Sequence, residues 1–451
     1  EMTSSLVGSE MCIRDRVNGA YNGSEKFAKG NKFGFFPSAA VGWVLSEEPF
    51  MKSIRKWVSL FKFRYSWGMV GSDNNIPRWL YVTQWSSMTN SAILGIPDAS
   101  RPTYPGYDVS NIGNEDAKWE TAIKNDFAVE TGFFDNRLNI SFDYFWGRRY
   151  DVFMNANQRN IPPWFGADPI AANIGRTKEH GWELETHWNH TLAFGLTYRL
   201  GAMFSYAKDE IVYMEDPEFT PFYQKQAGHQ IGQQKTKLTS GVIRSWDEMY
   251  TSVTGSNYSN AVVGMYRFVD YNGDGIVDTD DIVPYGYPNH PQYNMNFSLG
   301  LSWKGLNVMV QLYGTRNATL YQSPSEFSAP NYYSVVDKDV AADMWLPGVN
   351  ESGIHHIPTY MLGGDAEGWG DYYHKDGTMW RLKNAEISYD IKAKALKSVG
   401  INKINVYLNG NNLYVWSHLN EDRETGGKRE NSHTSMYPST RRVQLGLKVS
   451  F

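Results

Sequence analysis

The sequence predicts an all-β protein, an antiparallel transmembrane β-barrel of which this chain supplies about twelve strands. Apolar and polar residues alternate with a period of two in many stretches of roughly ten residues. Aromatic residues make up 15% of the 451 residues, and amphipathic rings are typical of the two interfaces of a membrane barrel. Short and long connections alternate between the predicted strands, which predicts short periplasmic turns and long extracellular loops.

Composition excludes several other classes of protein. No run approaches the ~18 apolar residues of a membrane-spanning helix. A mean hydropathy of −0.50 is compatible with a barrel, because each lipid-facing residue is offset by a lumen-facing one. The net charge of −5 and the lack of a basic stripe argue against nucleic acid as a partner. The single cysteine, Cys12, excludes an intrachain disulfide.

The first fifteen residues differ in character from the rest of the chain. Residues 1–15 resemble a translated sequencing adapter, and no signal peptide is recognisable among them. We therefore expect residues 16–451 to be the native part. We also expect the reading frame to be truncated, so that the true N-terminal part of the protein is missing.

Three strands are predicted before the first long loop. Residues 16–22 have the pattern of a strand end, and residues 35–45 alternate until Pro49 interrupts the pattern. Residues 60–69 alternate aromatic with polar side chains. Residues 71–119 contain several Pro and Gly residues without sustained alternation, which predicts a long loop.

Nine further strands are predicted, mostly in hairpins. They lie at residues 124–133, 138–146, 182–188, 196–206, 293–303, 306–312, 385–391, 402–416 and 441–451. Short connections lie at residues 134–137, 190–194, 304–305 and 392–401, and long ones at about 150–178, 208–291, 313–378 and 417–440. The last strand alternates Val443, Leu445, Leu447 and Val449 with polar residues and ends on Phe451. This pattern is typical of the closing strand of a membrane barrel.

Residues 270–281 form the sharpest local motif. Oxygen-bearing side chains at positions 1, 3, 5, 9 and 12 of the loop, with Gly275 at the sixth, match a calcium-binding loop. The predicted ligands are Asp270, Asn272, Asp274, the backbone carbonyl of Ile276, Asp278 and Asp281. The last position is Asp rather than Glu, and the flanking residues do not predict a helix–loop–helix pair. The alternative is an Asx-rich turn without metal. We expect a calcium ion here to stiffen a loop.

Other loops contain weaker candidates. Trp164, Trp345 and Trp369 lie in loops rich in Pro and Gly, where a tryptophan either stacks on a sugar ring or packs its own loop. The histidines between residues 355 and 374 match no metal-ligand spacing. The sequence contains no nucleophile elbow, phosphate loop or zinc motif, so we expect no enzyme activity.

Several segments, taken in order, resemble the SusC/RagA-type TonB-linked outer-membrane proteins. They are Phe35–Ser38, Gly42–Trp43, Ser46–Met51, Phe63–Gly68, Gly181–Glu185, Asp270–Asp281, Trp380–Ala385 and Tyr437–Pro438. The resemblance extends over residues 17–451. It implies the C-terminal part of a barrel of about 22 strands, in which the plug domain, the TonB box and the early strands are absent from this sequence.

The resemblance also implies a function. Such proteins import oligosaccharides or peptides across the outer membrane of Gram-negative bacteria, with energy from the TonB complex and a SusD-like surface lipoprotein as partner. Two alternatives remain. An enzyme on a complete smaller barrel requires an acid/base set near the outer rim. A secreted, calcium-stiffened glycan-binding β-protein requires no lipid.

Overall fold

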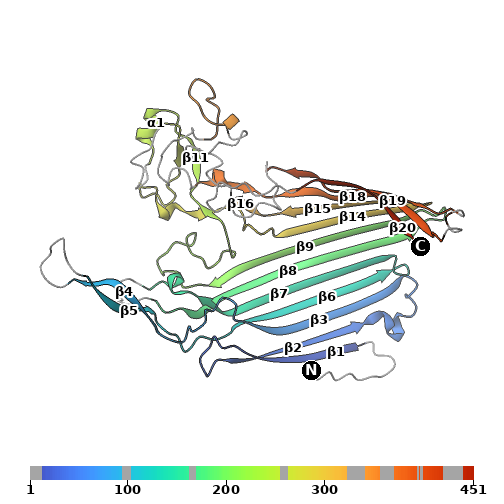
Figure 1. Ribbon diagram of the computed structural model, residues 1–451, viewed down its shortest axis with the longest axis horizontal. Coiled ribbons are helices and arrows are strands. Elements are labelled where there is room, and N and C mark those ends of the chain that lie inside the picture. The colour runs from blue at the N-terminus through green and yellow to red at the C-terminus, as the bar shows by residue number, and fades with distance from the viewer. Residues whose placement is uncertain are drawn as a thin grey trace.

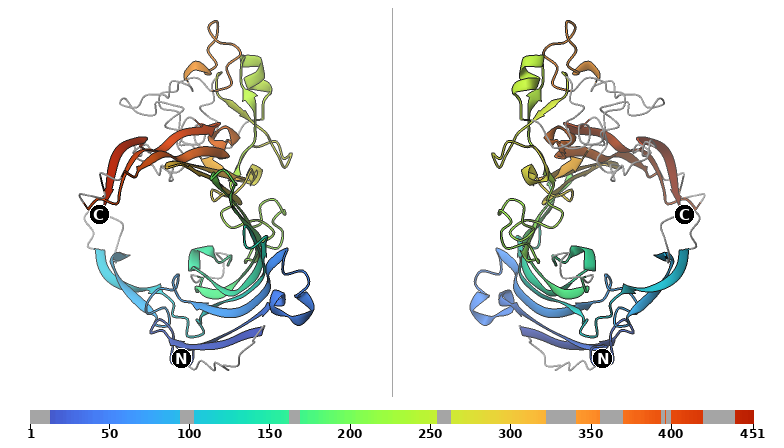
Figure 2. Two further views of the ribbon diagram at one scale, coloured as in Figure 1. Left: turned by 90° about the vertical axis from the view of Figure 1, so that its right-hand side faces the viewer. Right: turned by 90° about the vertical axis from the view of Figure 1, so that its left-hand side faces the viewer.

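A computed structural model describes residues 13–93, 103–161, 169–253, 263–321, 341–355, 370–393, 396, 400–419 and 440–451. Its main feature is one antiparallel sheet of twelve strands. In spatial order they are β1 (Ile13–Gly23), β2 (Phe33–Val44), β3 (Val58–Ser72), β6 (Glu120–Phe133), β7 (Leu138–Met154), β8 (Ala172–Thr191), β9 (Thr197–Tyr213), β14 (Tyr293–Trp303), β15 (Leu306–Arg316), β18 (Met379–Ile391), β19 (Lys403–Ser417) and β20 (Arg442–Ser450). The sheet curves through an incomplete ring with β1 and β20 at its two ends (Figure 2). The predicted partial barrel is confirmed.

The connections leave the sheet at two different rims. The turns at residues 134–137, 192–196 and 304–305 lie at one end of the strands. Figure 1 shows the long connections gathered at the opposite end. The predicted separation of short turns from long loops is therefore confirmed. We call these two ends the turn rim and the loop rim.

The two faces of the sheet have different chemistry. On β9, for example, Leu200, Ala202, Phe204 and Tyr206 share one face, and the register places Leu299 of β14 beside Leu200. We call the face carrying these rows the outer face and the opposite, polar face the inner face. Large apolar residues of the outer face remain exposed, up to 79% for Leu445. An apolar face left open over a long sheet is the lipid-facing surface of a membrane barrel.

Smaller elements lie in the long connections. They are β4 (Gln84–Ile93), β5 (Thr103–Asn111), β10 (Lys235–Thr236), β11 (Thr239–Val242), β12 (Tyr266–Phe268), β13 (Val283–Pro284), β16 (Thr319–Tyr321), β17 (His374–Asp376), α1 (Trp246–Thr251), and the 3-10 turns η1 (Leu45–Glu47), η2 (Pro49–Met51), η3 (Ala156–Gln158), η6 (Thr279–Asp281) and η8 (Asp371–Tyr373). The helix α1 begins after Ser245, whose side chain accepts a hydrogen bond from the backbone N–H of Glu248.

Two sequence-based expectations need correction. Residues 71–119 are not simply a loop, because β4 and β5 pair there as a hairpin that projects beyond the loop rim (Figure 1). The connections predicted at 150–178 and 208–291 also begin too early, since β7 continues to Met154 and β9 to Tyr213. These strand ends stand beyond the lipid, where neither face has to be apolar, so the alternation that marks a strand is lost.

Among the described residues, no helix combines the length and the apolar character needed to cross a membrane.

Candidate functional site

Ion pairs join three neighbouring strands on the inner face. The register places Lys62 of β3 opposite Glu130 of β6, and the Lys62 Nζ lies 3.0 Å from the Glu130 Oε2. Arg64 lies opposite Ala128, and Ala128 lies opposite Asp143 of β7. Because Ala128 is small and fully buried, the guanidinium of Arg64 passes over it and lies 2.6 Å from Asp143.

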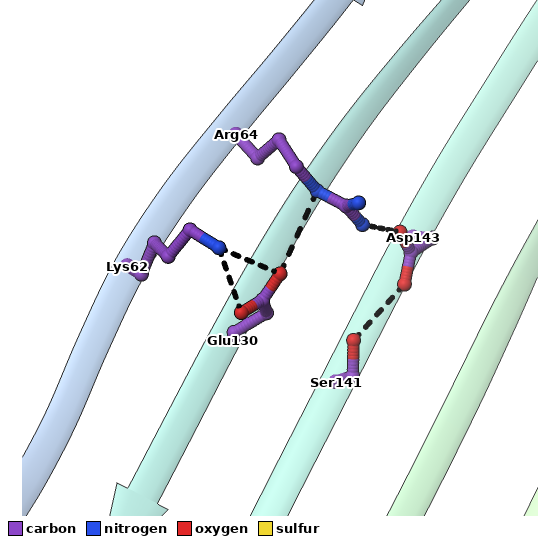
Figure 3. A network of polar contacts seen from close by, with 5 residues as sticks. All are labelled: Lys62, Arg64, Glu130, Ser141 and Asp143. Carbon is purple, nitrogen blue, oxygen red and sulfur yellow. Dashed lines mark hydrogen bonds and ion pairs between the residues drawn. The ribbon is translucent and has the colours of Figure 1, made fainter. Parts of the chain in front are cut away.

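Figure 3 shows two further contacts of this network: Glu130 also lies beside Arg64, and Ser141 lies beside Asp143. The Nε of Arg64 lies 3.6 Å from Glu130, and Ser141 donates to Asp143 at 3.0 Å. These side chains are between one fifth and two fifths exposed, so each pair contributes modestly to stability, on the order of 0.5 kcal/mol. The network gives the inner face a charged, wettable surface rather than a packed core.

Amides accompany the charged residues on the inner face of the C-terminal strands. Gln311 donates to Asn296 at 3.3 Å across β14 and β15. On β19, Asn409 donates to Asn384 at 2.9 Å and to Glu386 at 3.0 Å. Carboxamides present donors and acceptors without a net charge. The inner face is therefore hydrophilic over both its N-terminal and its C-terminal strands, as expected for a face that borders water.

Aromatic residues form two rows on the outer face. Near the loop rim, Tyr144, Trp182, Tyr206 and Tyr293 lie opposite one another on neighbouring strands. The Tyr206 and Tyr293 ring centroids are 4.7 Å apart. Near the turn rim, Tyr198 and Trp303 belong to the second row. Tyr198 and Tyr206 are separated by about 26 Å at ~3.3 Å per residue, which is close to the ~25 Å apolar band of outer-membrane barrels.

Two long connections above the loop rim pack against each other. The connection between β9 and β14 contributes Val242, Tyr266, Phe268 and Val277 to a buried cluster, and the connection between β15 and β18 contributes Trp345 and Tyr373. We call these two connections the loop module. Tyr266 and His355 are linked across the two connections, with 3.2 Å between the hydroxyl and Nδ1. The two connections therefore form one folded unit.

The predicted tryptophans have different outcomes. Trp164 and Trp369 lie outside the described residues. Trp345 is 5% exposed and belongs to the buried cluster of the loop module. Within the part of the chain that the structure describes, its indole N–H has no hydrogen-bond partner. The ring is thus covered by protein in this structure, which matches the alternative in which the tryptophan packs its own loop.

A second buried histidine lies between the same two connections. His374 is 9% exposed, and its Nδ1–H donates to the carbonyl of Gly370 at 3.2 Å. Burial lowers the pKa of His374 below its ordinary value of 6.5, against smaller opposing effects of the Gly370 bond and Asp371. Asp371 accepts hydrogen bonds from the backbone N–H and the hydroxyl of Thr239. His356 lies outside the described residues.

The calcium-type loop is folded by hydrogen bonds to its own carboxylates. Asp270 accepts from the N–H of Gly273 at 2.7 Å and of Gly275 at 2.9 Å. Asp281 is fully buried and accepts backbone N–H bonds from Tyr271, Asn272 and Asp278. Within the described ranges, no three His, Cys, Asp or Glu side chains are grouped to hold a metal ion. The all-oxygen donor set has the chemistry that calcium prefers, so the calcium site stays a prediction.

The remaining predicted ligands lie on the same loop. Asp274 accepts from the N–H of Ile276 at 2.8 Å and from the amide of Asn272 at 2.9 Å. Asp278 accepts from the N–H of Asp280 at 2.8 Å. These are the bonds of successive Asx turns.

Comparison with known proteins identifies the family of this chain. The β-barrel family described as "TonB dependent receptor-like, beta-barrel" matches residues 13–413. The chain belongs to the TonB-dependent receptor β-barrel family. Members of this family are outer-membrane β-barrels, so the chain is part of an outer-membrane protein.

Individual relatives agree with this assignment. TonB-dependent receptor P26 of Formosa agariphila is 26% identical over 456 residues, which cover 96% of this chain and 44% of the relative. SusC of Bacteroides thetaiotaomicron is 24% identical over 450 residues, which cover 96% of this chain and 41% of SusC. The chain thus spans less than half the length of these relatives, which are receptors and not enzymes.

Solved structures show the same fold. The RagAB peptide importer in its "closed-closed" state superposes with a TM-score of 0.72 at 18% identity. The match covers 98% of this chain and 46% of that chain. The resemblance to SusC/RagA-type proteins that the sequence predicts is therefore confirmed.

Proposed function

We propose that the complete protein imports a nutrient, an oligosaccharide or a peptide, across the outer membrane. The continuous hydrophilic inner face is the observation that carries this proposal. Its charged part extends over β3, β6 and β7, and its amide part over β14 to β19. A wall with lipid on one side and water on the other suits a protein that passes polar cargo.

The partners follow from the family. We propose that the complete protein takes energy from the TonB complex and works with a SusD-like surface lipoprotein. The support is the similarity to SusC and to the RagAB peptide importer. The loop module stands at the loop rim, where cargo and a surface lipoprotein arrive first (Figure 1).

Uptake measurements test the proposal. A strain lacking the gene is expected to lose uptake of one labelled cargo class, either oligosaccharides or peptides, and to regain it with the wild-type gene. A second strain that lacks TonB is expected to show the same loss. Undiminished uptake of both cargo classes in the deletion strain, on media where each is the sole nutrient, contradicts the proposal.

Calcium is a separate proposal about the loop at residues 270–281. The support is the oxygen donor set and the position of the loop in the connection between β9 and β14. There the ion would hold Asp270, Asn272, Asp274, Ile276, Asp278 and Asp281 together and stiffen the loop module. It has no role in a chemical reaction.

A further inference from the structure

Cations follow the aromatic row on the outer face of three neighbouring strands. Arg148 comes two residues after Trp146 on β7, and Lys208 comes two residues after Tyr206 on β9. On β8, which runs in the opposite direction, Trp182 is preceded by His180 and Lys178. We call Arg148, Lys178 and Lys208 the rim cations; His180 lies among them.

Strand parity places the rim cations on the outer face. Residues two apart on a strand share a face, and each rim cation is an even number of residues from an outward aromatic residue on its own strand. The pairing register agrees, because Arg148 lies opposite Lys178 and His180 lies opposite Lys208. His180 and Lys208 lie one two-residue step, about 7 Å, beyond Trp182 and Tyr206, at the depth of the lipid head groups, and Arg148 and Lys178 lie one such step further.

Two of the rim cations lack an acidic partner among the described residues. Like charges directly opposite each other across a strand pair are destabilising. Lys178 forms an ion pair with Glu210 of β9 at 2.8 Å. Among the residues that the structure describes, Arg148 and Lys208 have no carboxylate within 4.0 Å. Arg148, Lys178 and His180 are exposed at this height, so a counter-ion from outside has free access.

We propose that the rim cations bind the phosphate groups of a phosphorylated lipid in the outer leaflet. The lipid interface of the outer face continues without a break into this cluster, and the charge is complementary to phosphate. Arginine and lysine both form short charge-assisted bonds to phosphate oxygens. Trp146, Trp182 and Tyr206 then lie beside the junction between the head group and the acyl chains. The bound anion supplies the negative charge that the described residues do not place beside Arg148 and Lys208.

Binding of defined lipids to the complete protein in neutral detergent tests the proposal. The probes are diphosphoryl lipid A and the same lipid after removal of both phosphates, measured by native mass spectrometry. The wild-type protein is expected to prefer the phosphorylated lipid. The R148Q/K208Q variant is expected to bind it about tenfold or more weakly, because two charged contacts are lost. The R148K/K208R variant keeps both charges and is expected to retain the affinity.

A matched control removes two cations from the opposite rim. Lys52 and Lys56 are exposed on the connection between β2 and β3, so K52Q/K56Q has the same change in net charge. This control is expected to bind lipid A within about twofold of the wild-type protein. Equal binding of the two lipids by the wild-type protein, or equal loss in both double variants, overturns the proposal. The comparison of the two lipids on the wild-type protein needs no variant to fold.

Discussion

Arg64 on β3 donates to Asp143 on β7 at 2.6 Å, although β6 lies between these two strands. The contact is formed only because the residue between them is Ala128, which has no side chain beyond Cβ. One small residue thus allows a salt bridge to join two strands that share no backbone hydrogen bonds.

Enlarging Ala128 is expected to remove this contact. In A128L, the new side chain fills the path of the guanidinium, and we expect the free energy of unfolding to fall by about 1–3 kcal/mol. Urea unfolding of the complete protein in detergent measures the change. The control A202L adds the same atoms on the lipid-facing side of β9 and is expected to change stability little. Equal effects of the two substitutions contradict the explanation.

Gly181 on β8 is expected to tolerate no side chain. A Cβ at this position collides with the carbonyl oxygen of Tyr206 and with the ring of Phe145. We expect G181A to lower the free energy of unfolding by about 1–3 kcal/mol, as measured by the same unfolding experiment. At Gly300 a Cβ meets only the Cβ of Arg199, at 3.6 Å, so G300A is the control and is expected to be nearly neutral. A larger loss from G300A than from G181A contradicts the steric argument.

The loop module is expected to loosen in acid. Because burial lowers the pKa of His374, the neutral ring is favoured in the folded module. Its contribution to stability is complete above pH 6.5, and it decreases as the pH falls below 6.5 toward the folded pKa. Limited proteolysis from about pH 7.5 to about pH 5, the range in which histidine titrates, measures how far the loop module loosens.

The groups around His374 define the control for that experiment. Tyr285 and Tyr321 contact the ring at 5.8 and 5.3 Å between centroids, and the charged groups nearby are Asp371 and Lys375. H374F keeps the aromatic packing and is expected to abolish most of the pH dependence below pH 6.5. An unchanged pH profile in H374F contradicts the assignment to this histidine.

A substitution of Asp274 distinguishes calcium binding from the folding of the loop. Its side chain is exposed, whereas Asp281 is fully buried among backbone N–H groups. We expect D274N to weaken calcium binding about tenfold or more, since a charged ligand is lost, and to leave the calcium-free loop intact. Calorimetric titration measures the affinity. D247N on α1 is the control, and equal affinities of both variants contradict the calcium site.

Truncating Trp345 is expected to act through packing. W345A leaves a cavity in the buried cluster and should cost the loop module about 3–5 kcal/mol. Protease cleavage in residues 236–376 of the folded protein is then expected to accelerate. Loss of cargo binding with unchanged protease resistance indicates a stacking role for this ring and contradicts the packing role.

The sequence predicts the membrane wall better than the loops. Along β9 or β14, one face meets lipid and the other water, so the local pattern contains the needed information. The β4–β5 hairpin was not predicted, because it lies outside the lipid and neither face has to be apolar. Arg64 and Asp143 are 79 residues apart in sequence. Their contact depends on the register of three strands, which no local pattern specifies.

The loop residues illustrate the same limit. The burial of Trp345 and His374 depends on packing between two connections, one before β14 and one after β15. The residues that flank Trp345 in the sequence do not distinguish it from an exposed aromatic residue. The rim cations, in contrast, are visible in the sequence as charges that continue the aromatic alternation on β7, β8 and β9.

The fusion of two connections into the loop module also has a mechanical consequence. These connections arise from β9, β14, β15 and β18, which are consecutive in the sheet. A force applied to either connection is therefore distributed over four strands through the Tyr266–His355 and Thr239–Asp371 hydrogen bonds. Such a force is expected to produce a small bend of these four strands together, and not a rotation of one hairpin relative to the rest of the sheet.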